Sequence, residues 1–319
     1  MSSVLELLEA HYGIASATVL GEPDDRVTRV SSPRGELAVK RFTADDVELA
    51  NREAGLLAVL APIDPRYRVQ SLLQTRDAAL LAFVEDDAAV LVTHWCRGSM
   101  KVYTDIAEAE WHALGTELGA LHMRLTRFTG SLPRASEFVV DLTAEREKIT
   151  GIRGRVASRE PARSAEIGRY LDARLALLDT HGERGATPPP GPEHAIHNDY
   201  NQYNYLFDGT LPPIILDWEG AIAAPQAYEV VRCLNHLPLV APTHATAFVN
   251  GYRSVRPLDR DTVRWAVDRC LLEHAIKSWP LEQLLAGTSH AERALAGSME
   301  VLLALHAGVQ ELERFFGLG

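Results

Sequence analysis

The chain of 319 residues contains few cysteines and no long apolar run. The three cysteines lie far apart and include no C-x-x-C pair, which argues against a disulfide framework or a zinc ribbon and favours a reducing, cytoplasmic location. No stretch approaches the roughly 20 apolar residues of a membrane span, and the acidic N-terminus lacks a basic leader. We therefore expect neither a membrane partner nor a signal peptide.

Positive charge is also scarce. The formal net charge is -11, and the basic residues are nearly all arginine, with lysine only at Lys40, Lys101, Lys148 and Lys277. A general nucleic-acid binder needs a basic stripe, so the composition argues against nucleic acid as a partner. The length exceeds the ~250 residues at which single cores stop growing, so two lobes are expected.

Hydrophobic periodicity changes character near residue 95. Before this point, period-two patterns predict short strands, and a helical pattern covers residues 44–60. The strands are expected near 17–20, 26–30, 36–42, 67–75, 79–83 and 89–93. Beyond Gly98, helical patterns occupy 104–127, 141–158, 162–181 and, interrupted by prolines, 226–319. The sequence therefore predicts an α+β fold with a sheet-and-helix N-terminal lobe (1–95), a mainly helical lobe (96–319) and a hinge near 94–98.

The most informative motif is H-x-D-x-x-x-x-N over residues 197–204. A short strand, an Asp-Gly turn and a return strand at 214–216 follow, so a hairpin would bring Asp217 beside Asn204. Phosphoryl transfer from a metal-bound nucleotide needs such groups. Asp199 is predicted to orient the attacking hydroxyl and accept its proton, while Asn204 and Asp217 supply oxygen ligands to Mg²⁺.

Lys40 lies in an apolar strand and is expected to neutralise nucleotide phosphates. Its predicted partner is Glu53 on the next helix, with Glu48 as the second candidate. The alternative is an exposed strand lysine and a solvated helix acid. The turn at 21–25 occupies the place of a phosphate-covering loop, but it has one glycine and several acids and so carries no phosphate signal of its own.

The segment from His94 to Cys96 is the predicted hinge between the lobes. Backbone groups of His94, Trp95 and Cys96 are expected to pair with an adenine edge there.

Together these features resemble the aminoglycoside phosphotransferase and choline kinase-like family, whose members are small-molecule kinases with a protein-kinase-like fold. The resemblance covers about residues 15–235 and implies ATP or GTP and Mg²⁺ as cofactors. It implies the roles given above for Asp199, Asn204, Asp217 and Lys40. The residues that carry it are Lys40, Glu53, the 118–122 helix end, His197, Asp199, Asn204 and the D-W-E run at 217–219.

Three positions depart from the family pattern. Asn198 stands where glycine is usual, Gln202-Tyr203 where Pro-Gly is usual, and Tyr228-Glu229 where Tyr-Asp is usual. No catalytic group is lost. The departures leave the subfamily, and with it the acceptor, open.

The remaining histidines and acids have simpler interpretations. His194 and His197 lack a third soft ligand, so a zinc site is not expected, and His197 is predicted to brace the catalytic loop. His122 is predicted to be a satisfied core histidine. Glu219, Glu229 and Glu273 either line a cationic acceptor pocket or serve as helix caps and core hydrogen-bond partners.

The predicted function is transfer of the γ-phosphate of ATP to a hydroxyl of a small molecule, such as an aminoglycoside, amino alcohol, homoserine or sugar. The alternative is a nucleotide-binding, pseudokinase-like regulator without transfer activity, which the glycine-poor turn favours. No G-x-S-x-G elbow is present, so acyl-transfer hydrolysis has no support. The acceptor, the choice between ATP and GTP, and the oligomeric state stay open.

Overall fold

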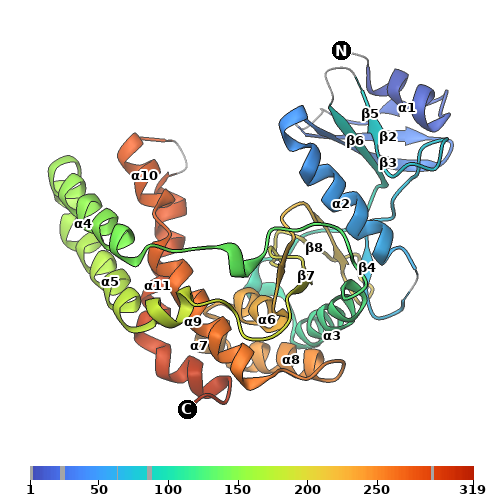
Figure 1. The fold of residues 1–319 in the computed structure, drawn as a ribbon. Coiled ribbons are helices and arrows are strands. Elements are labelled where there is room, and N and C mark those ends of the chain that lie inside the picture. The colour runs from blue at the N-terminus through green and yellow to red at the C-terminus, as the bar shows by residue number, and fades with distance from the viewer. Residues whose placement is uncertain (1–2, 22–25, 63, 85–87, 289–290) are drawn as a thin grey trace. The chain divides into compact units, whose positions relative to one another are not determined.

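A computed structural model describes residues 3–21, 26–62, 64–84, 88–288 and 291–319, and the chain divides into two compact units (Figure 1). Unit 1 comprises Met1–Pro133, His194–Ala223 and Ala247–Arg256, and unit 2 comprises Arg134–Glu193, Ala224–Thr246 and Pro257–Gly319. Each unit is therefore assembled from three separate stretches of the chain. The predicted lobe boundary near residue 95 lies within unit 1.

A five-stranded antiparallel sheet begins unit 1, with strand order β1-β2-β3-β6-β5. Side chains alternate along β3, so Leu37 and Val39 join the buried core while Lys40 faces the opposite side. Helix α1 (Val4–Tyr12) covers the core face through Leu8 and Tyr12. The strands are β1 (Thr18–Val19), β2 (Val27–Ser32), β3 (Gly35–Phe42), β5 (Ala82–Phe83) and β6 (Ala89–His94).

Helix α2 (Val47–Leu60) follows a short 3₁₀ turn, η1 (Ala44–Asp46). Together the two elements confirm the helix predicted over 44–60. It contacts β3 and β6 from the face that carries Lys40 (Figure 1). Glu53 lies on the buried side of α2, whereas Glu48 is exposed. The helix thus presents one carboxylate to the sheet.

The segment predicted as a strand at 67–75 is divided between two sheets. Arg68–Val69 forms a strand, β4, that pairs in parallel with β9 (Ile214–Ile215), whereas Leu72 forms an antiparallel bridge with Thr93 of β6 in the N-terminal sheet. β9 also pairs antiparallel with β8 (Tyr205–Leu206), which confirms the predicted hairpin after the H-x-D motif. The Arg68 guanidinium binds Asp208 in the hairpin turn, at 3.0 and 2.7 Å, so β4 supports the hairpin.

Helix α3 (Glu108–Leu125) and the end of α8 (Pro242–Arg253) pack against each other in unit 1. The helices approach so closely that a Cβ on Gly251 would lie 2.1 Å from the carbonyl oxygen of His112. His122 is buried, and its Nδ1 lies 2.9 Å from the Tyr252 hydroxyl, as expected for a satisfied core histidine. A short two-stranded sheet joins β7 (His194–Ile196) to β10 (Ile222–Ala224).

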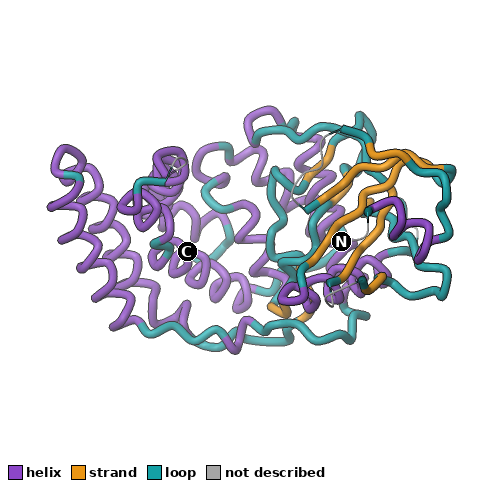
Figure 2. The backbone as a smooth tube through the Cα atoms, turned by 90° about the horizontal axis from the view of Figure 1, so that it is seen from above, coloured by secondary structure: helices purple, strands orange, loops and turns teal. Residues whose placement is uncertain are grey.

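Unit 2 consists mainly of helices and loops, as the colouring of Figure 2 shows. Its longest helices are α5 and α11, and a 3₁₀ turn, η5 (Pro161–Arg163), lies between the helices predicted over 141–158 and 162–181. No described helix is both long and apolar enough to cross a membrane. The helices are α4 (Leu142–Arg159), α5 (Ser164–Ala186), α6 (Gln226–Leu234), α7 (Leu237–Val240), the start of α8, α9 (Arg260–Ile276), α10 (Trp279–Ala286) and α11 (Ala291–Phe315).

Buried charges tie the helices of unit 2 together. Asp268 on α9 accepts hydrogen bonds from Arg184 on α5 and lies 2.7 Å from His181 Nδ1. Burial opposes its charge, but these two partners lower the pKa of Asp268 below its usual value. Glu273 on α9 accepts from the Tyr228 hydroxyl at 2.6 Å and from Arg232 at 2.8 Å. Glu273 is thus a partner of other core groups.

Candidate active site

The H-x-D loop is held in place by its histidine. The Asp199 N–H donates to His197 Nδ1 at 3.2 Å, so Nε2 carries the proton that is donated to the Leu216 carbonyl at 2.7 Å. The ring also packs against Trp218, with centroids 4.5 Å apart. His197 therefore joins the catalytic loop to the strand before Asp217, which confirms its predicted bracing role.

The departure at Asn198 has a conformational explanation. This residue has φ 66°, in the left-handed region that glycine adopts freely and asparagine tolerates better than most residues. Its side-chain amide donates to the Gly220 carbonyl at 3.0 Å. Asparagine therefore satisfies the same backbone requirement as glycine and adds a contact to the loop that follows Asp217.

Neutral amides hold the Asp199 carboxylate on both sides. Asn201 Nδ2 donates to Oδ1 at 2.7 Å, and Asn204 Nδ2 donates to Oδ2 and to the Asp199 carbonyl, each at 2.9 Å. No cation pairs with this carboxylate among the described ion pairs. The carboxylate is therefore oriented without being neutralised.

The hairpin brings the second acid to the same place, as predicted. Leu216 N–H donates to the Asn204 carbonyl at 3.0 Å, which sets Asp217 close to Asn204 in the ladder. Asp217 has φ 62°, and its own N–H donates to Gln70 Oε1 at 3.2 Å. A residue from the strand-like segment near β4 thus helps to hold the unusual backbone at Asp217.

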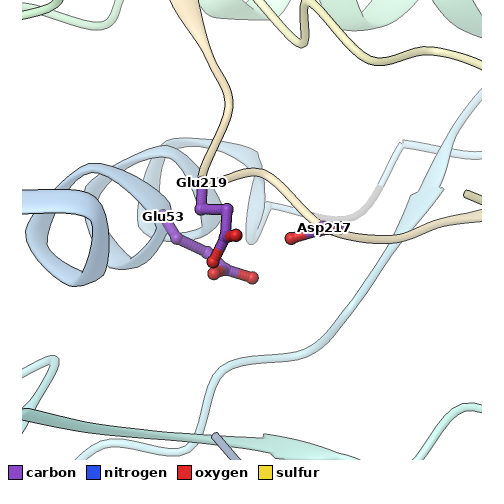
Figure 3. A group of neighbouring side chains, drawn as sticks. All are labelled: Glu53, Asp217 and Glu219. Carbon is purple, nitrogen blue, oxygen red and sulfur yellow. The ribbon is translucent and has the colours of Figure 1, made fainter. Parts of the chain in front are cut away.

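Lys40 is the centre of an ion-pair cluster. Its Nζ lies 2.8 Å from Glu53, 3.0 Å from Asp217 and 2.9 Å from Glu219, all carboxylate oxygens. Figure 3 shows the carboxylates of Glu53, from α2, and Glu219 lying together with Asp217 beside them, and one oxygen of each lies within 4.8 Å of the others. Glu53, the first predicted partner of Lys40, is the one the structure selects over Glu48.

The charges in this cluster stabilise each other. Burial opposes the charge of Lys40, but Glu53 and Asp217 outweigh it and raise the pKa of Lys40 above its usual value. Burial likewise opposes ionisation of Glu219, and Lys40 and Arg26 overcome it to lower the pKa of Glu219. Lys40 and Glu219 are therefore both charged near neutral pH.

Arg26 adds a second cation that the sequence did not single out. Its guanidinium forms two hydrogen bonds with Glu219, Nη1–Oε1 at 3.0 Å and Nη2–Oε2 at 2.9 Å. Arg52 on α2 donates to the Glu219 backbone carbonyl at 3.0 Å. The D-W-E loop is thus attached to the sheet and to α2 through its glutamate.

These groups line a cavity of about 740 Å³ that lies wholly within unit 1. This volume is within the range of small-ligand pockets, which runs from roughly 300 to 1,000 Å³. The predicted residues Lys40, Glu53, His94, Trp95, Cys96, Asn204 and Asp217 all contribute to the lining. Asp199 is not part of the lining and lies next to it through its bond to Asn204.

The segment from His94 to Gly98 forms one wall of the cavity. The N–H groups of His94 and Trp95 donate to Ser71 and Glu36 carbonyls, whereas the Cys96 N–H donates to no group in the described ranges. A Cβ on Gly98 would lie 2.6 Å from the Phe207 carbonyl oxygen, so only glycine fits where this segment meets the end of β8. Of the three predicted hinge amides, Cys96 is the one open to a ligand.

The oxygen donors of the cavity fit a hard divalent cation. Asn204 uses its amide nitrogen for Asp199, which leaves the side-chain oxygen as its ligating atom, and Asp217 Oδ2 accepts no hydrogen bond from the described residues. Carboxylate and carboxamide oxygens suit Mg²⁺, which retains several waters and needs few protein ligands. The donor set therefore matches the metal that the sequence predicted.

Arg26 and Gln70 are among the cavity residues that escaped the sequence-based prediction of the site. Both lie in segments predicted as strands, but neither belongs to a motif, and each meets Asp217 or Glu219 from a distant part of the chain. The D-W-E run pointed to Glu219, but no pattern in the sequence pointed to its partner Arg26. Residues 22–25, which belong to the predicted phosphate-covering turn, lie outside the described residues.

The profile of the phosphotransferase enzyme family matches residues 18–266, which is most of the chain and includes every cavity residue above. The chain belongs to this phosphotransferase enzyme family. The predicted family is thus confirmed. Homoserine kinase from Beijerinckia indica subsp. indica is 29% identical over 163 residues, which are 49% of this chain and 47% of that protein. The chain therefore spans about half the length of this curated relative.

Solved structures of other phosphotransferases share the fold. A spectinomycin phosphotransferase in complex with ADP and spectinomycin has a TM-score of 0.60 and 17% identity, and the match covers 99% of this chain and 97% of that one. Amicoumacin kinase in complex with AMP-PNP and Ca²⁺ has a TM-score of 0.64 and 14% identity, covering 94% of this chain and 92% of that one. These likenesses confirm the predicted α+β, protein-kinase-like fold of this family member.

Proposed function

We propose that the protein transfers the γ-phosphoryl group of ATP to a hydroxyl of a small molecule in a Mg²⁺-dependent reaction. The observation that carries this proposal is the joint placement of Lys40, Asn204 and Asp217 on one cavity with Asp199 directly beside it. Family membership supports the reaction class. The nucleotide complexes of the related structures support a nucleotide as the phosphoryl donor.

The residues divide the chemistry between them. Asp199 accepts a hydrogen bond from the acceptor hydroxyl, orients its oxygen and takes its proton as the new O–P bond forms. The bond from the γ-phosphorus to the bridging oxygen breaks, and ADP leaves with that electron pair. Lys40 binds the phosphates. Mg²⁺, held by Asn204 and Asp217, would offset charge on the phosphates when bound.

The purine is assigned to the hinge wall at His94, Trp95 and Cys96. Since the other two amides already donate within the protein, the Cys96 N–H is the proposed donor to the base. Adenine presents an acceptor nitrogen beside its amino group, whereas guanine presents N–H and carbonyl in the opposite order. Competition between ATP and GTP for the same site would therefore measure how well the hinge selects the base.

The acceptor class follows from the relatives only in outline. Homoserine kinase and the spectinomycin and amicoumacin enzymes are named for small hydroxylated acceptors. We propose an acceptor of this general size. Glu229 and Glu273 are not assigned to its binding, because Glu229 is buried and Glu273 is engaged by Tyr228 and Arg232.

The test is an ADP-release assay with a panel of acceptors, run with Mg²⁺ and with excess EDTA. The panel contains homoserine, an amino alcohol, choline, an aminocyclitol antibiotic, an aminoglycoside and simple sugars. We expect Mg²⁺-dependent ADP release that rises with one class of acceptor, and a phosphorylated product in the mass spectrum. Nucleotide binding without turnover on any acceptor would instead favour the nucleotide-binding regulator.

A further inference from the structure

The segment that precedes β2 in the sequence has a composition unsuited to phosphate binding. Residues 21–25 contain Glu22, Asp24 and Asp25, a single glycine and no basic residue. A glycine-rich turn binds phosphates through several converging backbone N–H groups, and acidic side chains at that point repel them. Another group must supply the contacts if a triphosphate is to be bound there.

Arg26 is the first residue after this segment, and its guanidinium lies close to the Lys40 ammonium group. Both cations lie over the Phe42 ring, Arg26 at 5.4 Å and Lys40 at 5.2 Å from its centroid. Both also bind the same carboxylate, that of Glu219. The cavity therefore has two adjacent cations at one end.

The two cations differ in their freedom. The Lys40 side chain is 14% exposed and is held by three carboxylates, whereas the Arg26 side chain is 45% exposed and is held by Glu219. The arginine side of this pair is open to solvent, so a ligand with more charge can reach the guanidinium and compete with Glu219 for it. A guanidinium also has a planar fork of donors that matches phosphate oxygens as well as it matches a carboxylate.

Charge balance favours such an exchange. The three carboxylates of Glu53, Asp217 and Glu219 surround the two cations Arg26 and Lys40. An incoming triphosphate adds negative charge, and a cation that turns from a carboxylate toward it offsets part of that charge.

We propose that Arg26 is a phosphate-binding residue that exchanges Glu219 for the outer phosphates of the nucleotide. It takes the part that backbone N–H groups of a glycine-rich turn would otherwise play. This inference rests on the proposed nucleotide-dependent function and assigns one of its binding groups.

Calorimetric titration with adenosine, AMP, ADP and AMP-PNP tests it, both in EDTA and with Mg²⁺. Arg26→Ala is expected to weaken AMP-PNP binding by about 10- to 100-fold, the usual worth of hydrogen bonds to charged groups, and adenosine binding by less than about twofold. ADP should fall between them. Arg26→Lys, which keeps the charge and loses the fork, should recover part of the loss.

Two matched arginines serve as controls. Arg29 lies on the same strand and lines the same cavity, but it binds Glu36 and stacks over Trp95 at the hinge end. Arg29→Ala should therefore weaken all four ligands by the same factor. Arg34 lies in the exposed β2–β3 turn, outside the cavity. Arg34→Ala removes the same charge there and should leave all four affinities unchanged.

Glu219→Gln separates direct phosphate binding from an indirect effect. If Arg26 exchanges partners, removing the competing carboxylate should tighten ADP binding in EDTA. If Arg26 only positions Glu219, Glu219→Gln should weaken binding as Arg26→Ala does, and that result would overturn the inference. An equal loss of affinity for adenosine and AMP-PNP in Arg26→Ala would also overturn the inference. A wild-type protein that binds none of the four ligands would instead refute the proposed function.

Discussion

The proposed active site has a Lys40 end and an Asp199 end, and their carboxylates have different kinds of partner. At the Lys40 end, charges are paired: Glu53, Asp217 and Glu219 surround Lys40, and Arg26 completes the cluster. At the Asp199 end, the carboxylate is held by the neutral amides of Asn201 and Asn204. The two ends differ in how their charges are paired, although the hairpin between Asn204 and Asp217 joins them.

The difference matches the task proposed for each end. The cations that bind phosphates need partners of opposite charge while no nucleotide is bound. A carboxylate can fill that role, because the phosphate replaces it when the nucleotide binds. A group that accepts a proton must keep its basicity, and a salt bridge would lower it. The amide groups of Asn201 and Asn204 orient the Asp199 carboxylate without such a bridge.

The largest expected effect is at the Asp199 end. Asp199→Asn keeps the shape of the side chain and removes the proton acceptor, so kcat should fall by about 10²-fold or more. AMP-PNP affinity, measured by calorimetry, should stay close to that of the wild type because Asp199 lies outside the cavity lining. Turnover near the wild-type level would remove Asp199 from its proposed role.

The next effect tests the Lys40 end. Glu53→Gln removes the buried carboxylate partner of Lys40 and leaves the lysine to Asp217 and Glu219, where it competes with metal binding. We expect kcat/KM for ATP to fall roughly 10- to 100-fold, in line with the loss of a charge-assisted hydrogen bond.

Glu48→Gln is the matched control, since Glu48 is exposed on the same helix and was the other candidate partner from the sequence. It should behave as wild type. Equal losses of kcat/KM in the two variants would mean that activity depends on the total charge of α2. The specific Lys40–Glu53 contact would then have no role.

A smaller effect distinguishes orientation from charge. Asn201→Ala removes the 2.7 Å hydrogen bond to Asp199 Oδ1, so we expect kcat to fall about tenfold with little change in KM for ATP. The adjacent Gln202 accepts instead from the Tyr103 N–H, at 2.6 Å, and Gln202→Ala should have a much smaller effect on kcat. A change confined to KM in Asn201→Ala would contradict an orienting role.

The smallest effect concerns an ion pair outside the cavity. Arg68 and the two hydrogen bonds from Thr210 lower the pKa of Asp208, and this pairing supports the β8–β9 hairpin. Asp208→Asn should reduce the free energy of unfolding by at most about 1 kcal/mol at pH 7, the range for surface pairs. Urea denaturation measures it.

The sign of the pH dependence follows from the lowered pKa. A depressed carboxyl pKa stabilises the fold above the unfolded value of about 3.9 and loses that contribution as the pH falls through the folded value. The difference between wild type and Asp208→Asn should therefore shrink below about pH 4. A difference that grows with acid would show that another group dominates.

Local patterns were enough to predict the elements that carry the site. The apolar pattern at 36–42 predicted the strand that carries Lys40, and the turn at Asp208 predicted the hairpin that carries Asp217. Both depend on residues close together in the chain. The roles assigned to Asp199, Asn204 and Asp217, and the lobe boundary near residue 95, stay predictions.

The partner of β4 could not be predicted in the same way. Arg68–Val69 is only two residues long, and its parallel partner Ile214–Ile215 lies far along the chain. A two-residue segment can pair with many sheet edges, so local sequence does not choose between them. The choice depends on which edge is nearby after packing.

The sequence by itself determined the order and spacing of the reactive groups, because the H-x-D loop, the hairpin and the Lys40 strand are built from local backbone preferences. Only the tertiary structure decided that Arg26 meets Glu219 across 193 residues and that Glu219 joins Lys40. Side chains so far apart in the chain have no local preference for one another. They meet because the sheet, α2 and the D-W-E loop pack around one cavity, and burial there makes pairing of their charges necessary.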